Sequence, residues 1–159
     1  MGTLLSWVLS IGLLAMTTQS ADQAGVMNVM QAFFDTMTAH DVEGARKILQ
    51  PQGRFHAMTM KDGKPDVRAF SNEEYFAQLQ GDLSKRKLRE RIWNPEVRIN
   101  GLIATLIAPY DFWIDGKFSH CGTDTFDFIK TEEGWKIAGG VYTVESTCAP
   151  SPLGPLTPQ

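Results

Sequence analysis

The residues of this sequence that could do chemistry lie in its C-terminal half, on neighbouring predicted strands. Asn100-Gly101 and Asp115-Gly116 each separate alternating apolar runs, a pattern typical of two-residue hairpin turns. A third turn is predicted over residues 131–134. Pairing the strands from these turns places side chains of one row about 5 Å apart. That row contains one imidazole and three carboxylates: His120, Asp111, Glu145 and Glu90.

His120 is the centre of this predicted row, with Asp111 opposite it on one side and Glu145 on the other. Glu90 then lies opposite Asp111. Nearby carboxylates favour the imidazolium, so we expect a raised pKa for His120 and a group able to bind or move a proton. The alternative is that the row forms the solvated rim of the sheet. Bulges at Pro95 or Pro109 would move Glu90, or Glu90 and Asp111, to the other face.

Asp124 lies further along the strand of His120 and has apolar neighbours in the predicted pairing. A carboxyl group in such surroundings has a raised pKa and can donate a proton near neutral pH. His120 and Asp124 are therefore the candidate catalytic residues. The alternative role for Asp124 is a buried cap on a backbone amide.

The two faces of the predicted sheet are both apolar. One face carries Asp124 together with large side chains that should line a ligand pocket under the helices: Phe126, Phe128, Trp135 and Ile137. The other face carries Tyr110, Phe112 and Tyr142. One chain of this length has too few helices to cover both faces, so we expect a homodimer through the second face.

The elements that must position these residues read as α+β. Apolar residues at helical spacing predict a helix over residues 22–39, and Asp41 is a good N-cap for a second helix over 42–49. A short strand is expected over 54–60. Ser71 and Glu74 form a capping-box pattern that opens a third helix, which ends at Gly81. Residues 88–146 then predict a curved meander of four antiparallel strands.

The chain divides into three segments. Residues 1–20 contain no charged side chain and an apolar core too short to span a bilayer, which predicts a cleaved signal peptide and a secreted or periplasmic protein. An uncleaved anchor or a buried first helix are the alternatives. Residues 21–148 form one domain. Residues 149–159 contain four prolines and predict a disordered tail.

Charge and composition limit the kinds of binding partner that we expect. The net charge of −3 argues against a nucleic-acid binder, and after cleavage of residues 1–20 no membrane contact is expected. No motif predicts a metal site or a cofactor.

Cys121 and Cys148 suit a disulfide in an oxidising compartment. The straight pairing separates them by about 13 Å, so a bridge requires the chain after Glu145 to fold back.

The order of elements resembles the cone-shaped nuclear-transport-factor-two-like fold. Within it, the stretch from Tyr110 through Gly-Lys-Phe-Ser-His-Cys-Gly-Thr-Asp-Thr-Phe, then Gly134-Trp-Lys-Ile and Tyr142-Thr-Val, resembles the lumazine-binding branch, which is similar to SnoaL-like cyclases and ketosteroid isomerases. The resemblance implies a conical pocket and a sheet-mediated dimer. It implies no single activity, because this scaffold hosts isomerases, cyclases, dehydratases and binders.

Three functions are compatible with these features. The first is an exported protein that binds a small, partly apolar molecule without catalysis. The second is an isomerase, cyclase or dehydratase in which Asp124 or His120 moves a proton. The third is a non-catalytic dimerisation module.

Overall fold

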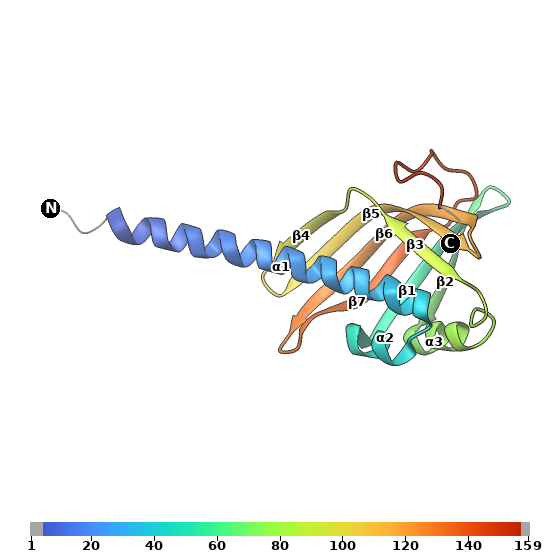
Figure 1. Ribbon diagram of the computed structural model, residues 1–159, viewed down its shortest axis with the longest axis horizontal. Helices are drawn as coiled ribbons and strands as arrows, with labels where there is room; N and C mark the ends of the chain where they lie inside the picture. The colour runs from blue at the N-terminus through green and yellow to red at the C-terminus, as the bar shows by residue number, and fades with distance from the viewer. Residues whose placement is uncertain (1–4, 157–159) are drawn as a thin grey trace.

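Three helices cover the concave face of a curved sheet of seven strands in the computed structural model, which describes residues 5–156, with side chains from Ser20 onward (Figure 1). The elements are α1 (Leu5–Ala39), α2 (Val42–Ile48), β1 (Leu49–Lys61), β2 (Lys64–Ser71), α3 (Asn72–Gln80), β3 (Leu88–Ile92), β4 (Glu96–Asn100), β5 (Ile103–Ile114), β6 (Lys117–Thr131) and β7 (Gly134–Thr143). This is the predicted α+β cone.

The helices follow the predicted boundaries except at the start of α1. We predicted a start at residue 22, but the helix begins at Leu5 and its N-terminal part projects beyond the sheet (Figure 1). Residues 1–4 of the predicted signal peptide lie outside the described residues. Within the described chain, no helix is long and apolar enough to cross a membrane.

The caps of α2 and α3 are the predicted ones. The Asp41 side chain accepts a hydrogen bond from the Gly44 backbone N–H at 2.9 Å. Ser71 and Glu74 form a reciprocal capping box at the start of α3, so each satisfies a backbone N–H that the first turn would otherwise leave free.

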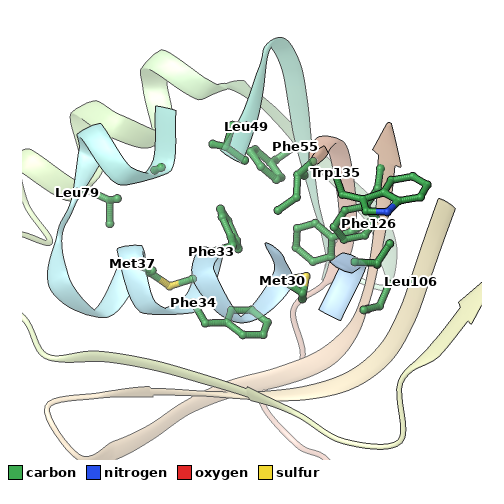
Figure 2. Close-up of a cluster of buried hydrophobic side chains, with 14 of the residues drawn as sticks. Met30, Phe33, Phe34, Met37, Leu49, Phe55, Leu79, Leu106, Phe126 and Trp135 are labelled. Carbon is green, nitrogen blue, oxygen red and sulfur yellow. The ribbon is translucent and has the colours of Figure 1, made fainter. Parts of the chain in front are cut away.

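The core lies between α1 and the concave face of the sheet. Met30, Phe33 and Met37 recur along one side of α1 and are buried. Figure 2 shows Met30 and Phe33 on the side of Phe126 and Leu106 from the sheet, whereas Met37 lies farther along α1, toward Leu79. Burial of this apolar stripe is what holds α1 across the strands, since helix stability in proteins comes chiefly from such packing.

The sheet is mixed, with strand order β2-β1-β7-β6-β5-β3 and β4 also paired with β5. Every pair is antiparallel except β1 with β7. The predicted strand over 54–60 is the central part of β1, and β2 was not predicted. The first strand of the predicted four-strand meander is interrupted at residues 93–95 and forms β3 and β4.

Three one-residue register shifts and one displaced turn separate the sheet from the predicted pairing. The turn predicted at Asn100-Gly101 is formed by Gly101-Leu102 instead, which pairs Asn100 with Ile103 and leaves the faces unchanged. The Asp115-Gly116 turn pairs Ile114 with Lys117 as expected, but the extra residue Ser119 then brings Phe112 opposite His120. Ala138 of β7 is a second extra residue, which shifts the pairing of β7 with β6. The third shift lies at residues 93–95, where Pro95 interrupts the strand. Each shift sends the side chains beyond it to the other face.

The face assigned to the homodimer is therefore wrong. Tyr110, Phe112 and Tyr142 point into the concave side, under the helices, and Tyr110 is only 1% exposed. The outer face instead exposes apolar residues, among them Ile107 and Val141.

The C-terminal segment returns to the sheet. Glu145 pairs with Cys121 through two backbone hydrogen bonds of 3.0 and 2.9 Å. The chain then turns, and Cys148 forms a disulfide with Cys121, with Cα atoms 6.4 Å apart. Residues 149–156 have no helix or strand, yet the Arg91 guanidinium donates to the Gly154 carbonyl at 2.8 Å. The tail we expected to be disordered thus lies against the outer face of the sheet.

Candidate functional site

A cavity of about 260 Å³ lies between the helices and the concave face of the sheet. Its walls are mainly aromatic and aliphatic side chains of α1, α3, β1 and β2. Its polar groups come from α3, β3, β5, β6 and β7, and they are Glu90, His120, Asp124, Gln78 and three tyrosines, Tyr75, Tyr110 and Tyr142. An apolar cavity with a few converging polar groups is the usual form of a small-molecule site.

Glu90 and Asp124 form the most unusual pair in this cavity. They come from β3 and β6, on either side of β5, and their carboxyl groups contact each other. Asp124 is 1% exposed, and its Oδ2 atom has no hydrogen-bond partner within residues 20–156. No lysine or arginine lines the cavity.

The pKa values of both carboxyl groups are raised. Burial disfavours the charged form and raises the pKa of Asp124 to about 7, with the hydrogen bond to Glu90 acting in the opposite direction. Burial, followed by the proximity of Asp124, raises the pKa of Glu90 well above its usual value. The pair therefore holds at least one proton near neutral pH, as two carboxyl groups that share a site do.

Three tyrosines line the same cavity as this pair. The Tyr110 hydroxyl donates to the Thr143 carbonyl at 2.7 Å, whereas the buried Tyr75 hydroxyl has no partner within the described residues. Burial raises the pKa of Tyr142 to about 12 and raises the pKa of Tyr75 and Tyr110 as well. All three hydroxyls stay protonated at physiological pH.

His120 lies in the cavity, but not in the predicted environment. Its ring stacks on Phe112 at 4.8 Å and meets the edge of Tyr110 at 5.8 Å. Ser119 Oγ lies 3.0 Å from Nδ1. Burial lowers the pKa of His120, so the predicted increase is wrong: no carboxylate faces the imidazole across the strands to offset the loss of hydration.

The predicted row of four ionisable residues is split between the two faces of the sheet. Glu90, Phe112 and His120 form one row on the concave face. The neighbouring row, on the outer face, runs through Arg91, Asp111, Cys121 and Glu145. The predicted pairings of His120 with Asp111 and Glu145 are wrong because each register shift exchanges the faces.

Asp111 and Glu145 therefore take no part in the cavity. Asp111 is 2% exposed and accepts two hydrogen bonds from Arg91, at 2.8 and 2.5 Å. Glu145 is exposed and accepts a hydrogen bond from Thr143 Oγ1 at 3.2 Å.

Of the four apolar residues predicted to line the pocket, one borders the cavity and three lie in the core beside it. Phe126 lines the cavity. Phe128, Trp135 and Ile137 lie on the concave face as expected, but they are buried in the core and do not border the cavity. Trp135 packs beside α1, where its Nε1–H donates a hydrogen bond to the Asp22 carboxylate at 3.2 Å.

The places of Tyr110 and Tyr142 in the cavity were not predicted from the sequence, which assigned both residues to the dimer face. One signal could have corrected Tyr142: Ala138-Gly139-Gly140 interrupts β7, and glycine within a strand often marks a bulge. Gly140 is also where the backbone approaches two rings, since a Cβ there would lie 3.0 Å from Phe126 and 3.2 Å from Phe55. No comparable signal marks the bulge at Ser119.

The cavity is therefore apolar and contains protonated tyrosine hydroxyls and one pair of ionisable carboxyl groups. It can hold a ring compound against aromatic walls and donate hydrogen bonds to an oxygen of that compound. It can also exchange a proton with the compound through Asp124. Among the described residues, no three His, Cys, Asp or Glu side chains gather closely enough to hold a metal ion.

Known structures share this fold at low sequence identity. A nuclear-transport-factor-two-like protein with a cystatin-like fold from Novosphingobium aromaticivorans has a TM-score of 0.68 and 14% identity, covering 94% of this chain and 95% of its own. A putative dehydratase from the same family in Streptomyces avermitilis has a TM-score of 0.63 and 16% identity, covering 81% and 99%.

A third structure has another described activity. It is a putative aromatic ring hydroxylase from Novosphingobium aromaticivorans, with a TM-score of 0.60 and 17% identity, covering 78% of this chain and 89% of its own. A search of the curated proteins finds no match. The model of the family described as "Putative lumazine-binding" matches residues 21–143. The chain therefore belongs to this family, and it shares its fold with nuclear-transport-factor-two-like proteins of known structure.

Proposed function

We propose that this protein binds a small, largely apolar molecule in the concave cavity and holds an oxygen atom of that molecule with the protonated Glu90–Asp124 pair. The observation that carries the proposal is the buried carboxyl pair, which among residues 20–156 has no cationic partner in the cavity and leaves Asp124 Oδ2 without a hydrogen bond. Such an arrangement costs stability in the free protein, and a ligand that completes the hydrogen bonding would offset this cost.

The volume limits the ligand. About 260 Å³ is slightly below the roughly 300–1,000 Å³ of sites for drug-sized molecules, so a compound of one or two rings fits. The stacked pair of Phe33 and Phe55, with ring centroids 5.8 Å apart, offers an aromatic wall. Membership of the family makes lumazine the first compound to test.

The first experiment is native mass spectrometry of the purified protein, followed by extraction and identification of any bound small molecule. The second is a titration with lumazine followed by its fluorescence. Leu83→Trp should block binding because Leu83 lines the cavity, and Leu102→Trp is the matched control in an exposed turn. Binding that is equal in both variants would place the ligand elsewhere.

A second pair of variants tests the carboxyl group. Glu90→Gln keeps the shape of the side chain but cannot share a proton with Asp124 in the same way, so ligand affinity should fall roughly tenfold. Glu96→Gln makes the same change on an exposed strand, where the side chain is 70% accessible, and should leave affinity unchanged.

Proton-transfer catalysis is the second candidate function, favoured by the raised pKa of Asp124. As a carboxylate, Asp124 would accept a proton from a C–H next to a carbonyl group and return it at another carbon. Tyr75 or protonated Glu90 would donate a hydrogen bond to the enolate oxygen. Incubating the recovered ligand with the protein in D₂O should give deuterium exchange that Asp124→Asn abolishes. Absence of exchange would leave binding as the function.

We propose further that the protein is exported and acts as a secreted or periplasmic protein. The uncharged apolar start of the sequence and the Cys121–Cys148 disulfide support this, because disulfides persist in oxidising compartments. N-terminal sequencing of material from the exported fraction should begin at Ala21. Material that begins at Met1 contradicts cleavage.

A homodimer through the outer face of β5, β6 and β7 is proposed in place of the predicted one. Ile103, Ile107 and Val141 are exposed there. Sedimentation as a monomer at micromolar concentration would contradict it.

A further inference from the structure

A second cavity lies on the outer face of the sheet, opposite the concave site. It has a volume of about 440 Å³ and lies between the sheet and the C-terminal segment 146–155, partly open to solvent. We propose that this outer cavity binds a neutral, planar ring compound that carries a carbonyl group. The proposal does not depend on the function proposed for the concave cavity, because the two sites share no lining residue.

The roof of the outer cavity is held at both ends. At one end Cys148 is bonded to Cys121 of β6, and at the other the Gly154 carbonyl accepts a hydrogen bond from Arg91 of β3. The bridge between Glu145 and Cys121 fixes the chain just before the roof begins. A cavity whose roof is tethered in this way is preformed, so a ligand loses less free energy to ordering the protein.

The floor of the outer cavity is aromatic. The register shift at Ser119 turns Phe118 to the outer face while His120 stays in the concave cavity. Phe118 meets Trp113 edge-to-face, with ring centroids 5.8 Å apart, and Trp93 completes the floor. Pro150 and Pro155 of the roof also line the cavity. Flat rings of this kind favour a planar ligand that can stack on them.

The charged groups of the outer cavity neutralise each other. Both carboxylate oxygens of Asp111 accept hydrogen bonds from Arg91, so neither charge is left for a ligand to balance. The Arg91 guanidinium also lies 5.4 Å from the Trp113 ring centroid, a cation–π distance. A charged ligand would find no partner here, which favours a neutral one.

One polar group is unsatisfied. Trp113 Nε1 is buried and has no hydrogen-bond partner within residues 20–156. An indole N–H only donates, and buried donors in folded proteins nearly always have an acceptor. A carbonyl oxygen of a ligand in the outer cavity would supply one once the indole ring turns its N–H, which has no exposed surface in the free protein, toward the cavity. The volume lies within the range of small-molecule sites and admits two fused rings.

Coumarin is a suitable probe because it is neutral, planar and bicyclic and has one carbonyl group. The experiment is a titration of the full-length protein with coumarin, followed by the indole N–H signals of its four tryptophans in NMR. Trp113→Phe assigns the signal of Trp113. We expect coumarin to shift this signal downfield and to leave Trp135, which already donates to Asp22, unchanged.

Matched variants locate the binding. Phe118→Ala removes an exposed part of the floor and should weaken coumarin binding several-fold, whereas Ile103→Ala on the same face should not. Trp113→Phe keeps a ring but loses the donor, so affinity should fall roughly 2- to 12-fold, as for one hydrogen bond. Naphthalene, which lacks the carbonyl group, should bind more weakly than coumarin to the wild type and equally to Trp113→Phe.

The tether gives the last arm of the test. Cys148→Ser frees the roof at one end and should weaken coumarin binding while the Trp135 signal stays in place. The proposal is overturned if coumarin leaves the Trp113 signal unmoved. It is overturned equally if Phe118→Ala and Ile103→Ala bind coumarin alike.

Discussion

The two faces of the sheet treat a buried carboxylate in opposite ways. On the outer face, Asp111 has both oxygens bonded to Arg91, which lies directly opposite it on β3. On the concave face, Asp124 has another carboxyl group, Glu90, as its neighbour, and its Oδ2 atom has no hydrogen-bond partner in the described part of the chain. The first arrangement satisfies every group and is structural. The second leaves the carboxyl pair without a counter-charge in the cavity and Asp124 Oδ2 without a hydrogen bond among the described residues. Such groups are common where a protein binds or transforms a ligand.

The same substitution on the two faces should therefore have opposite effects on stability. Asp111→Asn leaves Arg91 buried without a counter-charge and should lower the free energy of unfolding by about 3 kcal/mol. Urea denaturation measures the loss. Asp66→Asn, at an exposed position of β2, is the control and should stay within about 0.5 kcal/mol of wild type.

A double variant separates the ion pair from simple packing. Replacing both partners with apolar residues, as in Arg91→Met with Asp111→Leu, removes the unpaired charge and should recover much of the lost stability. If Asp111→Asn unfolds at the wild-type urea concentration, the structural role of the pair is wrong.

Asp124→Asn should stabilise the protein, and only at higher pH. A carboxyl group whose folded pKa is raised binds its proton more tightly in the native state, so it weakens stability as pH rises from about 4, the unfolded pKa, to about 7. The variant removes this loss. We expect its stability relative to wild type to increase between pH 5 and pH 8 by on the order of 2 kcal/mol. Equal differences at both pH values would show that Asp124 is satisfied in the wild type.

The sequence was sufficient for the fold and for part of the site. Helix caps at Asp41 and Ser71, the Asp115-Gly116 turn and the apolar stripe of α1 are local signals, and each is confirmed. Asp124 was also placed correctly in the concave interior. These features depend on residues a few positions apart, where propensity and periodicity decide the outcome.

The electrostatic partners could not be predicted in the same way. Pairing across four strands accumulates every register shift, and one extra residue at Ser119 is enough to exchange Asp111 for Phe112 opposite His120. Serine at that position carries no bulge signal. The disulfide was left open for the same reason, because the straight strand separated two cysteines that the turn after Glu145 brings together.

His120 offers a smaller test of the difference between the faces. Burial lowers its folded pKa, so the native state binds a proton less readily than the unfolded chain, and stability falls as pH drops below the unfolded value near 6.5. His120→Gln should therefore destabilise less at pH 5.5 than at pH 8.5, by a few tenths of a kcal/mol to about 1 kcal/mol. An NMR titration with His120 charged at pH 7 would contradict the concave placement.

The exposed apolar residues of the outer face give the smallest effect on the stability of a single chain and the clearest effect on association. Ile107 is 42% exposed and lies opposite Thr125 on β6, whose next neighbour is the exposed Val141. Ile107→Glu should change the unfolding free energy of the monomer by no more than about 0.5 kcal/mol, because a surface substitution breaks no buried contact. Placed in an interface between two copies, the same carboxylate would be desolvated without a partner and would separate them.

Sedimentation velocity should then show a dimer for wild type and a monomer for Ile107→Glu. Met60→Glu, on the exposed end of β1, is the matched control and should remain a dimer. If Ile107→Glu associates as wild type does, the outer face is not the interface, and its exposed side chains are ordinary surface residues.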